Sequence, residues 1–310
     1  MFKVKFKAKS GGLNQAGWNK AGIFVVLMLL LPLVQFAIFW VYVNINSIAY
    51  AFKTSELGGF TLENLEQVFT LLKTPQSDIR KAVVNTLKFF PINNFVVLPL
   101  SVLFAFFLFK RMPMGGFFRV VFFLPSIVAM VVFANLFVAI INPGGPMNYL
   151  FTEIFHVKKY PQFLFDAELA MPTVFYYVVW TGLGYNILLV TGAMFRIPDS
   201  IFESAKLEGC GFFREFISLV VPLIGPTVST LFITGTAGVL TAMGPILVLT
   251  PNGGPSRSTG TIAWYIYDQV NGMSEYYFPA ALGIVFTVIA MPVVLLTKFA
   301  LEKVFPAVEF

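Results

Sequence analysis

The sequence predicts an all-α membrane protein, a polytopic bundle of six transmembrane helices. Of its 310 residues, 57% are hydrophobic and only 12% are charged, and the mean hydropathy is +0.81. An ordinary soluble domain carries about a quarter charged residues, so this chain could not cover its surface for water. The third observation is that apolar residues form runs long enough to cross a lipid bilayer.

A helix that crosses the hydrocarbon core needs about 20 mostly apolar residues. Six such runs are present, and they are residues 23–43, 85–109, 120–141, 169–195, 223–249 and 277–301. The first run is too long for the apolar core of a signal peptide, so it is expected to remain as the first helix. Prolines inside the runs are tolerated because neighbouring helices in a bundle can satisfy the freed carbonyl groups.

The basic residues predict the orientation, because Lys and Arg concentrate on cytoplasmic loops. If the N-terminus is cytoplasmic, the inside segments hold 13 of the 21 basic residues, namely Lys3, Lys5, Lys7, Lys9, Lys20, Lys110, Arg111, Arg119, Arg196, Lys206, Arg214, Lys298 and Lys303. We therefore expect a cytoplasmic N-terminal segment (1–22), a transmembrane domain (23–301) and a cytoplasmic tail (302–310). The basic residues are dispersed between apolar runs, which disfavours nucleic-acid binding.

The sequence lacks the residues that enzymatic or metal chemistry needs. No Gly-Lys pair occurs, so a phosphate-binding loop of the P-loop type is excluded. Cys210 and His156 are the sole cysteine and histidine, which leaves no cysteine-rich or His-rich metal site and no Ser-His-Asp triad. We expect no catalytic residues, no metal and no cofactor in this chain. A membrane-embedded enzyme is accordingly a remote alternative.

An ATP-independent carrier or channel for a small polar solute remains the main alternative function. A proton- or sodium-coupled carrier usually places an ionisable residue deep in the membrane. Here only Asp166 and Glu168 lie near the start of the fourth run, and Lys88 lies near the outer end of the second.

Outside the apolar runs, the apolar residues of segment 60–69 recur at helical spacing. This pattern predicts a short amphipathic helix on the outer surface.

The loop between the fourth and fifth runs, residues 196–222, has the strongest local pattern. Ser200 and Glu203 have the spacing of a capping box, which predicts the start of a short helix. Gly209 provides a stop that can take a positive φ. A second short helix is expected from Phe212 into the membrane at Pro222, which gives a helix, glycine turn, helix element facing the cytoplasm.

This loop resembles the EAA loop of binding-protein-dependent ABC importers. That pattern is Glu-Ala-Ala, then a glycine six residues after the glutamate and a proline nineteen after it. The matching residues are Glu203-Ser204-Ala205, Gly209 and Pro222. The departures are Ser204 for the first alanine, Glu208 for the usual aspartate, and Leu219 and Val221 for the usual isoleucine and leucine. The resemblance implies that this loop couples the chain to separate ATPase subunits.

The resemblance extends over most of the chain and favours the sugar-permease branch. Its other segments are Asn85-Thr86-Leu87, Phe123-Leu124-Pro125, Thr250 to Pro255 and Tyr265-Ile266-Tyr267. The Gly-Gly-Pro segment is similar to that of the larger maltose-permease subunit type. The resemblance implies a type I ABC importer permease fold in a bacterial cytoplasmic membrane, in contact with membrane lipid.

The resemblance also implies the partners. They are a second, non-identical homologous permease, two ATP-binding cassette subunits that bind ATP and magnesium, and an extracytoplasmic solute-binding protein. The cargo of this branch is a sugar, an oligosaccharide or a related solute such as a glycerol phosphodiester.

Alignment with the maltose-type relative indicates a substrate pathway. On the fourth run it falls on Gly182 and Tyr185, with Trp180 and Asn186 nearby. Aromatic rings suit the C–H surface of a sugar, and an amide can bond its hydroxyl groups. On the fifth run the corresponding positions are Gly235, Val239 and Ala242. These residues are apolar here, whereas the relative has polar residues at these positions.

Overall fold

The computed structural model describes residues 20–53, 59–110, 112–157, 159–272 and 276–305. The chain divides into two units, Met1–Ala49 and Tyr50–Phe310, and each unit is described by itself. Within the described residues the protein is helical, and its one β-bridge is an isolated pair between Lys53 and Phe60. The all-α prediction is confirmed.

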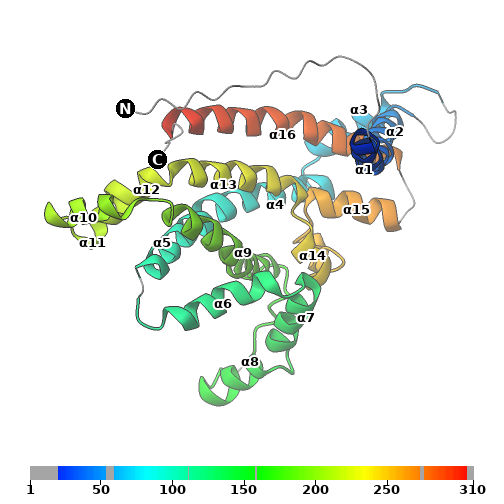
Figure 1. The fold of residues 1–310 in the computed structure, drawn as a ribbon. Helices are drawn as coiled ribbons and strands as arrows, with labels where there is room; N and C mark the ends of the chain where they lie inside the picture. Colours follow the sequence, from blue (N-terminus) through cyan, green and yellow to red (C-terminus); the bar gives the residue numbers. More distant parts are fainter. Residues whose placement is uncertain (1–19, 54–58, 111, 158, 273–275, 306–310) are drawn as a thin grey trace. The chain divides into compact units, whose positions relative to one another are not determined.

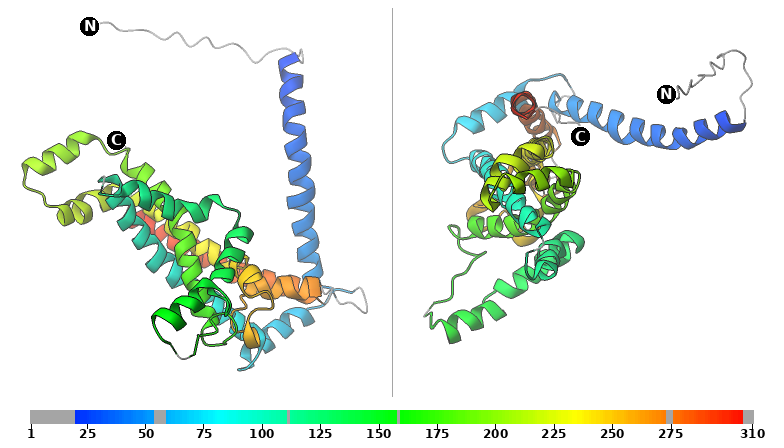
Figure 2. Two further views of the ribbon diagram at one scale, coloured as in Figure 1. Left: turned by 90° about the horizontal axis from the view of Figure 1, so that it is seen from below. Right: turned by 60° about the vertical axis from the view of Figure 1, so that its left-hand side comes forward.

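The first unit consists of one long helix. It comprises α1 (Lys20–Phe36), the π-helical segment η1 (Ala37–Tyr42) and the beginning of α2 (Val43–Ala51), and Figure 2 shows them as a continuous rod. The candidate span is Phe24–Ala51, and no residue of its most apolar window is buried. Polar side chains bond back into the helix: the Asn44 amide donates to the Trp40 carbonyl at 2.6 Å. A helix that is apolar all round needs lipid or another protein chain around it.

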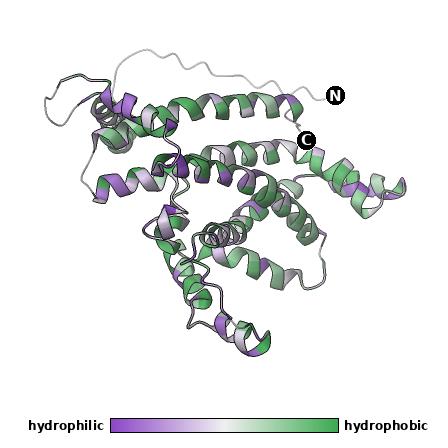
Figure 3. Cartoon of the chain, turned by 180° about the vertical axis from the view of Figure 1, so that it is seen from behind, coloured by the Kyte–Doolittle hydropathy of each residue, from purple (hydrophilic) through white to green (hydrophobic). Residues whose placement is uncertain are grey.

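The second unit contains the remaining helices. Their bounds are α3 Glu63–Lys73, α4 Asp78–Pro91, η2 Ile92–Val97, α5 Leu98–Phe109, α6 Gly115–Ile127, α7 Met130–Ile141, α8 Pro146–Tyr149, η3 Leu150–Ile154, α9 Ala170–Met194, α10 Asp199–Leu207, α11 Phe212–Arg214, η4 Glu215–Val220, α12 Val221–Leu223, α13 Gly225–Gly238, η5 Val239–Thr241, α14 Gly244–Leu249, η6 Pro255–Arg257, α15 Ile262–Gly272 and α16 Tyr277–Val304. Figure 1 shows their order, and Figure 3 shows apolar residues covering the long helices.

Four of the six predicted spans are confirmed as long apolar helices. They are Phe24–Ala51, Asp78–Phe109, Ala170–Met194 and Tyr277–Val304. The short amphipathic helix is also confirmed as α3, which packs on α16. Val68 is its buried apolar residue, and the buried Asn64 amide donates to the Lys53 carbonyl at 2.8 Å.

The third predicted span is wrong as a single helix over 120–141. The structure has two helices there, α6 and α7, separated by the extended Val128 and by Ala129, which is not helical either. The cause is Pro125, which has no amide hydrogen to bond the Val121 carbonyl and so weakens the last turn of α6. A candidate span begins instead at Met130 and runs to Ile154.

The fifth predicted span, 223–249, is also broken. The helical stretch Phe212–Leu223 meets Gly225–Thr241 at a bend of 70°, and the second stretch ends at Thr241. The helix α14 then starts separately at Gly244. Pro245 explains the second break, because it cannot donate to the Thr241 carbonyl.

The core of the second unit forms where α9 packs on α5 and α6. The two backbones approach closely at Gly184 on α9, where a Cβ atom would overlap the Phe122 carbonyl oxygen of α6. This position therefore requires glycine for the two backbones to touch.

We predict that Gly184→Ala destabilises the fold by about 1–3 kcal/mol, because the added methyl group must push α6 away from α9. The measurement is the thermal unfolding midpoint of the protein purified in detergent. The matched control is Gly192→Ala on the same helix, where no atom lies within 4 Å of the added Cβ. An equal midpoint for the two variants would contradict the packing argument.

Candidate functional site

The element that follows α9 has the predicted helix, turn, helix form. Its first helix, α10, begins at Asp199, after Pro198 in an extended conformation. The capping-box prediction is wrong, because Ser200 lies inside the helix and no side chain caps it. The Ser200 carbonyl accepts instead from the Ser204 hydroxyl at 2.9 Å. Asp199 is the carboxylate in the first turn, so Glu203 belongs to the second turn and is exposed.

The glycine turn is confirmed. Gly209 has a φ of +73°, and its amide donates to the Lys206 carbonyl at 3.0 Å. The next amide, of Cys210, donates to the Ala205 carbonyl at 2.9 Å. These two bonds form a Schellman motif, which satisfies carbonyl groups that a helix end otherwise leaves free. No atom lies within 4 Å of a Cβ built on Gly209, so its requirement for glycine comes from the backbone alone.

The second arm runs from Phe212 through α11, η4 and α12 to Leu223 as one helical stretch. Pro222 lies in α12, directly before the 70° bend into α13. The element therefore brings Glu203, Ser204, Ala205 and Gly209 together on its first arm. Pro222 lies at the far end of its second arm.

Aromatic rings from the end of α5 hold both arms. The Phe106 ring lies 4.9 Å from the rings of Phe212 and Phe216 on the second arm. The Phe109 ring lies 5.5 Å from that of Phe202, the buried residue of α10. These contacts were not predictable from the sequence, because residues about 100 positions apart show no shared periodicity.

Charged residues also connect the end of α5 to the two arms. Lys110, the residue after α5, forms an ion pair with Glu215, which is only 6% exposed. The Lys110 ammonium also lies 4.9 Å from the centre of the Phe202 ring. A cavity of about 650 Å³ opens beside α10, with cationic residues on its walls: Lys110, Arg196 and Lys206.

The tip of the element is apolar and exposed. Leu207, the last residue of α10, is 90% exposed, and Phe213 on the second arm is 70% exposed. Large apolar side chains at the end of a polar projection suit a docking contact with another chain. Neither residue was predicted from the sequence.

The predicted pathway residues lie in three environments. Trp180, Val239 and Ala242 belong to one apolar cluster, in which the Trp180 ring lies 5.0 Å from that of Phe133. Cβ atoms built on Gly182 and Gly235 would meet Val97 and Asn94, so these glycines face the helix stretch η2. Tyr185 is 60% exposed, and the half-buried Asn186 amide donates to the Gly182 carbonyl at 3.2 Å.

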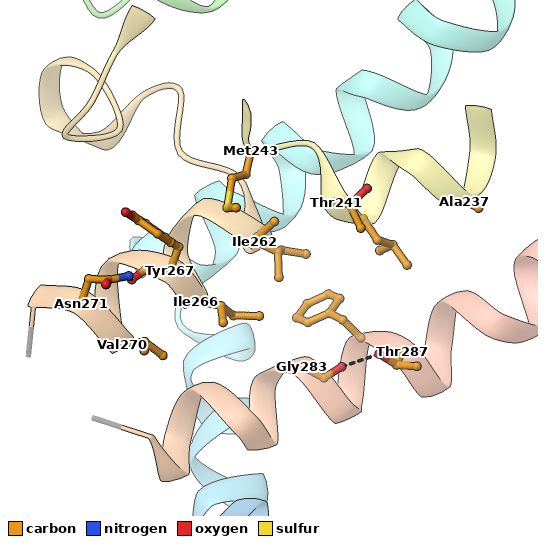
Figure 4. A pocket seen from close by; sticks show the side chains of 13 residues that line it. Ala237, Thr241, Met243, Ile262, Ile266, Tyr267, Val270, Asn271, Gly283 and Thr287 are labelled. Atoms are coloured by element: carbon orange, nitrogen blue, oxygen red, sulfur yellow. Dashed lines mark hydrogen bonds between the residues drawn. The ribbon is translucent and has the colours of Figure 1, made fainter. Parts of the chain in front are cut away.

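A groove of about 550 Å³ lies between η5, α15 and α16 (Figure 4). Its walls are mostly apolar and include Met243, Ile266 and Phe286, while Tyr267 and Asn271 contribute polar groups. None of the predicted pathway residues lines this groove, although Thr241 and Met243 are the neighbours of Ala242.

One segment of the resemblance, Asn85-Thr86-Leu87, bonds to the loop that leads from the Gly-Gly-Pro turn into α15. The Asn85 amide on α4 donates to the carbonyls of Ser258 and Gly260, at 2.8 and 3.1 Å. The Ile262 amide donates to the Thr86 hydroxyl at 2.9 Å. The Gly-Gly-Pro turn has φ values of +73° at Gly253 and +75° at Gly254. These bonds fix the loop after α14 to the side of α4.

Comparison with known families decides the identity of the chain. The model of the family described as "Binding-protein-dependent transport system inner membrane component" matches residues 97–309, which is more than two thirds of the 310 residues. The chain belongs to this family. The matched region includes both arms of the element and the Gly-Gly-Pro turn.

Curated relatives of this family member are permeases. It is 27% identical to the diacetylchitobiose uptake system permease protein NgcF of Streptomyces coelicolor, over 57% of this chain and 51% of the relative. It is 28% identical to the lactose transport system permease protein LacF of Rhizobium radiobacter, over 61% of this chain and 64% of the relative. The alignments thus span about half to two thirds of these relatives.

Two solved structures share the fold. A chain of a bacterial alginate ABC transporter, solved with an alginate pentasaccharide-bound periplasmic protein, matches 92% of this chain and 96% of its own length. The TM-score is 0.77 and the identity is 21%. Another structure, of a bacterial ABC transporter involved in alginate import, gives a TM-score of 0.77 at 23% identity. The fold is therefore that of a type I ABC importer permease, as the sequence predicts.

Proposed function

We propose that this chain is the membrane-spanning permease subunit of an ATP-driven importer and forms the translocation pathway for a sugar or oligosaccharide. An extracytoplasmic binding protein would deliver the solute. The observation that carries this proposal is the helix, Schellman turn and helix at Glu203 to Pro222, in a chain of this family. The names of the relatives, which are uptake or transport permeases for diacetylchitobiose and lactose, support a carbohydrate cargo.

The proposed assembly contains a second, homologous permease and two ATP-binding cassette subunits, which would bind ATP and magnesium and supply all catalytic activity. The exposed Leu207 and Phe213 offer the apolar contact that a groove on an ATPase subunit needs. The alternative, an ATP-independent carrier or channel, predicts that no ATPase co-purifies with the chain.

The proposed orientation places the termini and the element of residues 196–222 on the cytoplasmic side of a bacterial cytoplasmic membrane. The distribution of basic residues supports it. Segment 1–19 and residues 306–310 lie outside the described residues. The same division gives a transmembrane domain over 23–301. Docking of α10 on an ATPase subunit requires this orientation, because the ATPase subunit hydrolyses cytoplasmic ATP.

We predict that Gly209→Val weakens docking of the ATPase. A β-branched residue at positive φ costs at least about 1–2 kcal/mol, so α10 would lose its Schellman end and tilt. The expected result is less co-purified ATPase and weaker binding-protein-stimulated ATP hydrolysis, while the membrane helices still insert. The matched control is Gly211→Val, since Gly211 has a φ of −75° and no atom within 4 Å of an added Cβ. Normal docking, hydrolysis and uptake in Gly209→Val would refute the coupling role.

Among the predicted pathway residues, Tyr185 and Asn186 are the best placed to meet a sugar, because Tyr185 presents an exposed ring in mid-helix. Trp180 would contribute from the neighbouring turn. Gly182, Gly235, Val239 and Ala242 would shape the pathway through the packing of α9, α13 and η5.

We predict that Tyr185→Ala lowers solute uptake about 2- to 10-fold, because a lost stacking contact is worth about 0.5–1.5 kcal/mol. Co-purification of the ATPase should be unchanged, since the site is local. Leu188→Ala, which removes a similarly exposed side chain from the same helix, is the control. The pathway assignment fails if both variants take up solute at the wild-type rate.

A further inference from the structure

Glu215 is a buried carboxylate that the resemblance does not explain. It is 6% exposed and is the first residue of η4, where its amide donates to the Gly211 carbonyl at 2.8 Å. A buried charge is strongly unfavourable unless an opposite charge or hydrogen-bond donors compensate it. Among the described residues, Lys110 is the cation that pairs with it. The pair thus joins the end of α5 to the second arm of the element.

The same ammonium group contacts the first arm. Lys110 Nζ lies 4.9 Å from the centre of the Phe202 ring on α10, within the range of a cation–π interaction. Phe202 is buried, so this contact is shielded from most water. One positive charge at the end of a membrane helix therefore touches both arms, which are separated in sequence by the Gly209 turn.

Aromatic packing supports this arrangement from the α5 side. Phe106 contacts the second arm through Phe212 and Phe216, and Phe109 contacts the first arm through Phe202. Aromatic contacts tolerate sliding, whereas an ion pair between a buried carboxylate and one ammonium fixes a position. A shift of either arm relative to α5 therefore stretches a contact of Lys110.

We propose that Lys110 and Glu215 are a positioning pair that makes α5 the membrane helix that receives movement of α10. When the docked α10 moves, both arms carry Lys110 with them, and α5 follows because Lys110 directly continues its last turn. This inference rests on the proposed coupling function. It adds the two residues that transmit this movement from the loop to α5, since neither Lys110 nor Glu215 is among the residues that match the EAA pattern.

If the pair only stabilised the fold, replacing it would leave the solute taken up per ATP unchanged. Replacing both members of a buried ion pair by apolar residues of similar volume is often neutral or stabilising. A Lys110→Met/Glu215→Met double variant should therefore fold and assemble. It would keep an apolar contact that can slide, and it would lose the fixed position.

The experiment compares variants in the assembled complex reconstituted in proteoliposomes with its binding protein. Three quantities are measured: co-purified ATPase, binding-protein-stimulated ATP hydrolysis, and solute taken up per ATP hydrolysed. For the Lys110→Met/Glu215→Met variant we expect normal co-purification and a transport ratio at least about fivefold lower, the lower end of ordinary coupling effects. Lys110→Arg should keep a ratio within about twofold of wild type, because a guanidinium retains both the ion pair and the stacking on Phe202.

The matched control is Lys298→Met. Lys298 forms an ion pair with Glu302 on α16, but both side chains are about half exposed, at 50% and 55%, and the atoms are 3.7 Å apart. Exposed pairs of this kind contribute little. The transport ratio of this control should match wild type.

Three outcomes would overturn the inference. A wild-type ratio in the double methionine variant would show that the pair only stabilises the fold. A ratio in Lys110→Arg as low as that in the double variant would show that the charge is not what matters. Both results leave the proposed coupling function standing, because Gly209→Val tests docking separately. If wild-type protein carries no ATPase through purification, the proposed function and this inference fail together.

Discussion

The apolar cluster that joins α5 and α9 to the helical segments after α9 is the interaction on which the rest of the structure depends. It includes Phe106 on α5, Met194 at the end of α9, Phe202 on α10 and Val220 on the second arm. Lipid surrounds the long helices and is as apolar as their side chains, so the hydrophobic effect does not drive these helices together. Close packing must therefore fix the arrangement of the helices. Because α9 leads directly into α10, this packing also determines where the projecting element points.

Composition and hydropathy are sufficient to predict an all-α membrane bundle and four of its spans, because a helix in lipid satisfies its own backbone. The breaks after Ile127 and Thr241 could not be found this way, since the apolar runs continue through both. Pro125 and Pro245 were the available signals, but other prolines, such as Pro32 and Pro292, lie inside continuous helices. Whether a proline ends a helix depends on the packing around it, which the sequence alone does not show.

The candidate site likewise has features that the sequence predicts and features that it does not. The positive φ at Gly209 was predictable because only the local backbone decides it. The N-cap of α10 was predicted at Ser200, two positions too late, since the extended Pro198 is the N-cap and the helix begins at Asp199. The ion pair between Lys110 and Glu215 joins residues on separate helices, and each residue alone is consistent with a solvated loop charge. Docking therefore depends on a local motif, and positioning depends on contacts that only the fold creates.

The most direct test of the account is cysteine cross-linking at the tip of α10. In a Cys210→Ser background, Leu207→Cys would be labelled with a short reagent that carries one thiol-reactive and one photoactivatable group, and the assembled complex would be illuminated, with Val288→Cys on α16 as an exposed apolar control. The account predicts an adduct whose mass equals this chain plus one ATPase subunit at position 207, and none at position 288. An ATPase that co-purifies but forms no adduct at position 207 would contradict it.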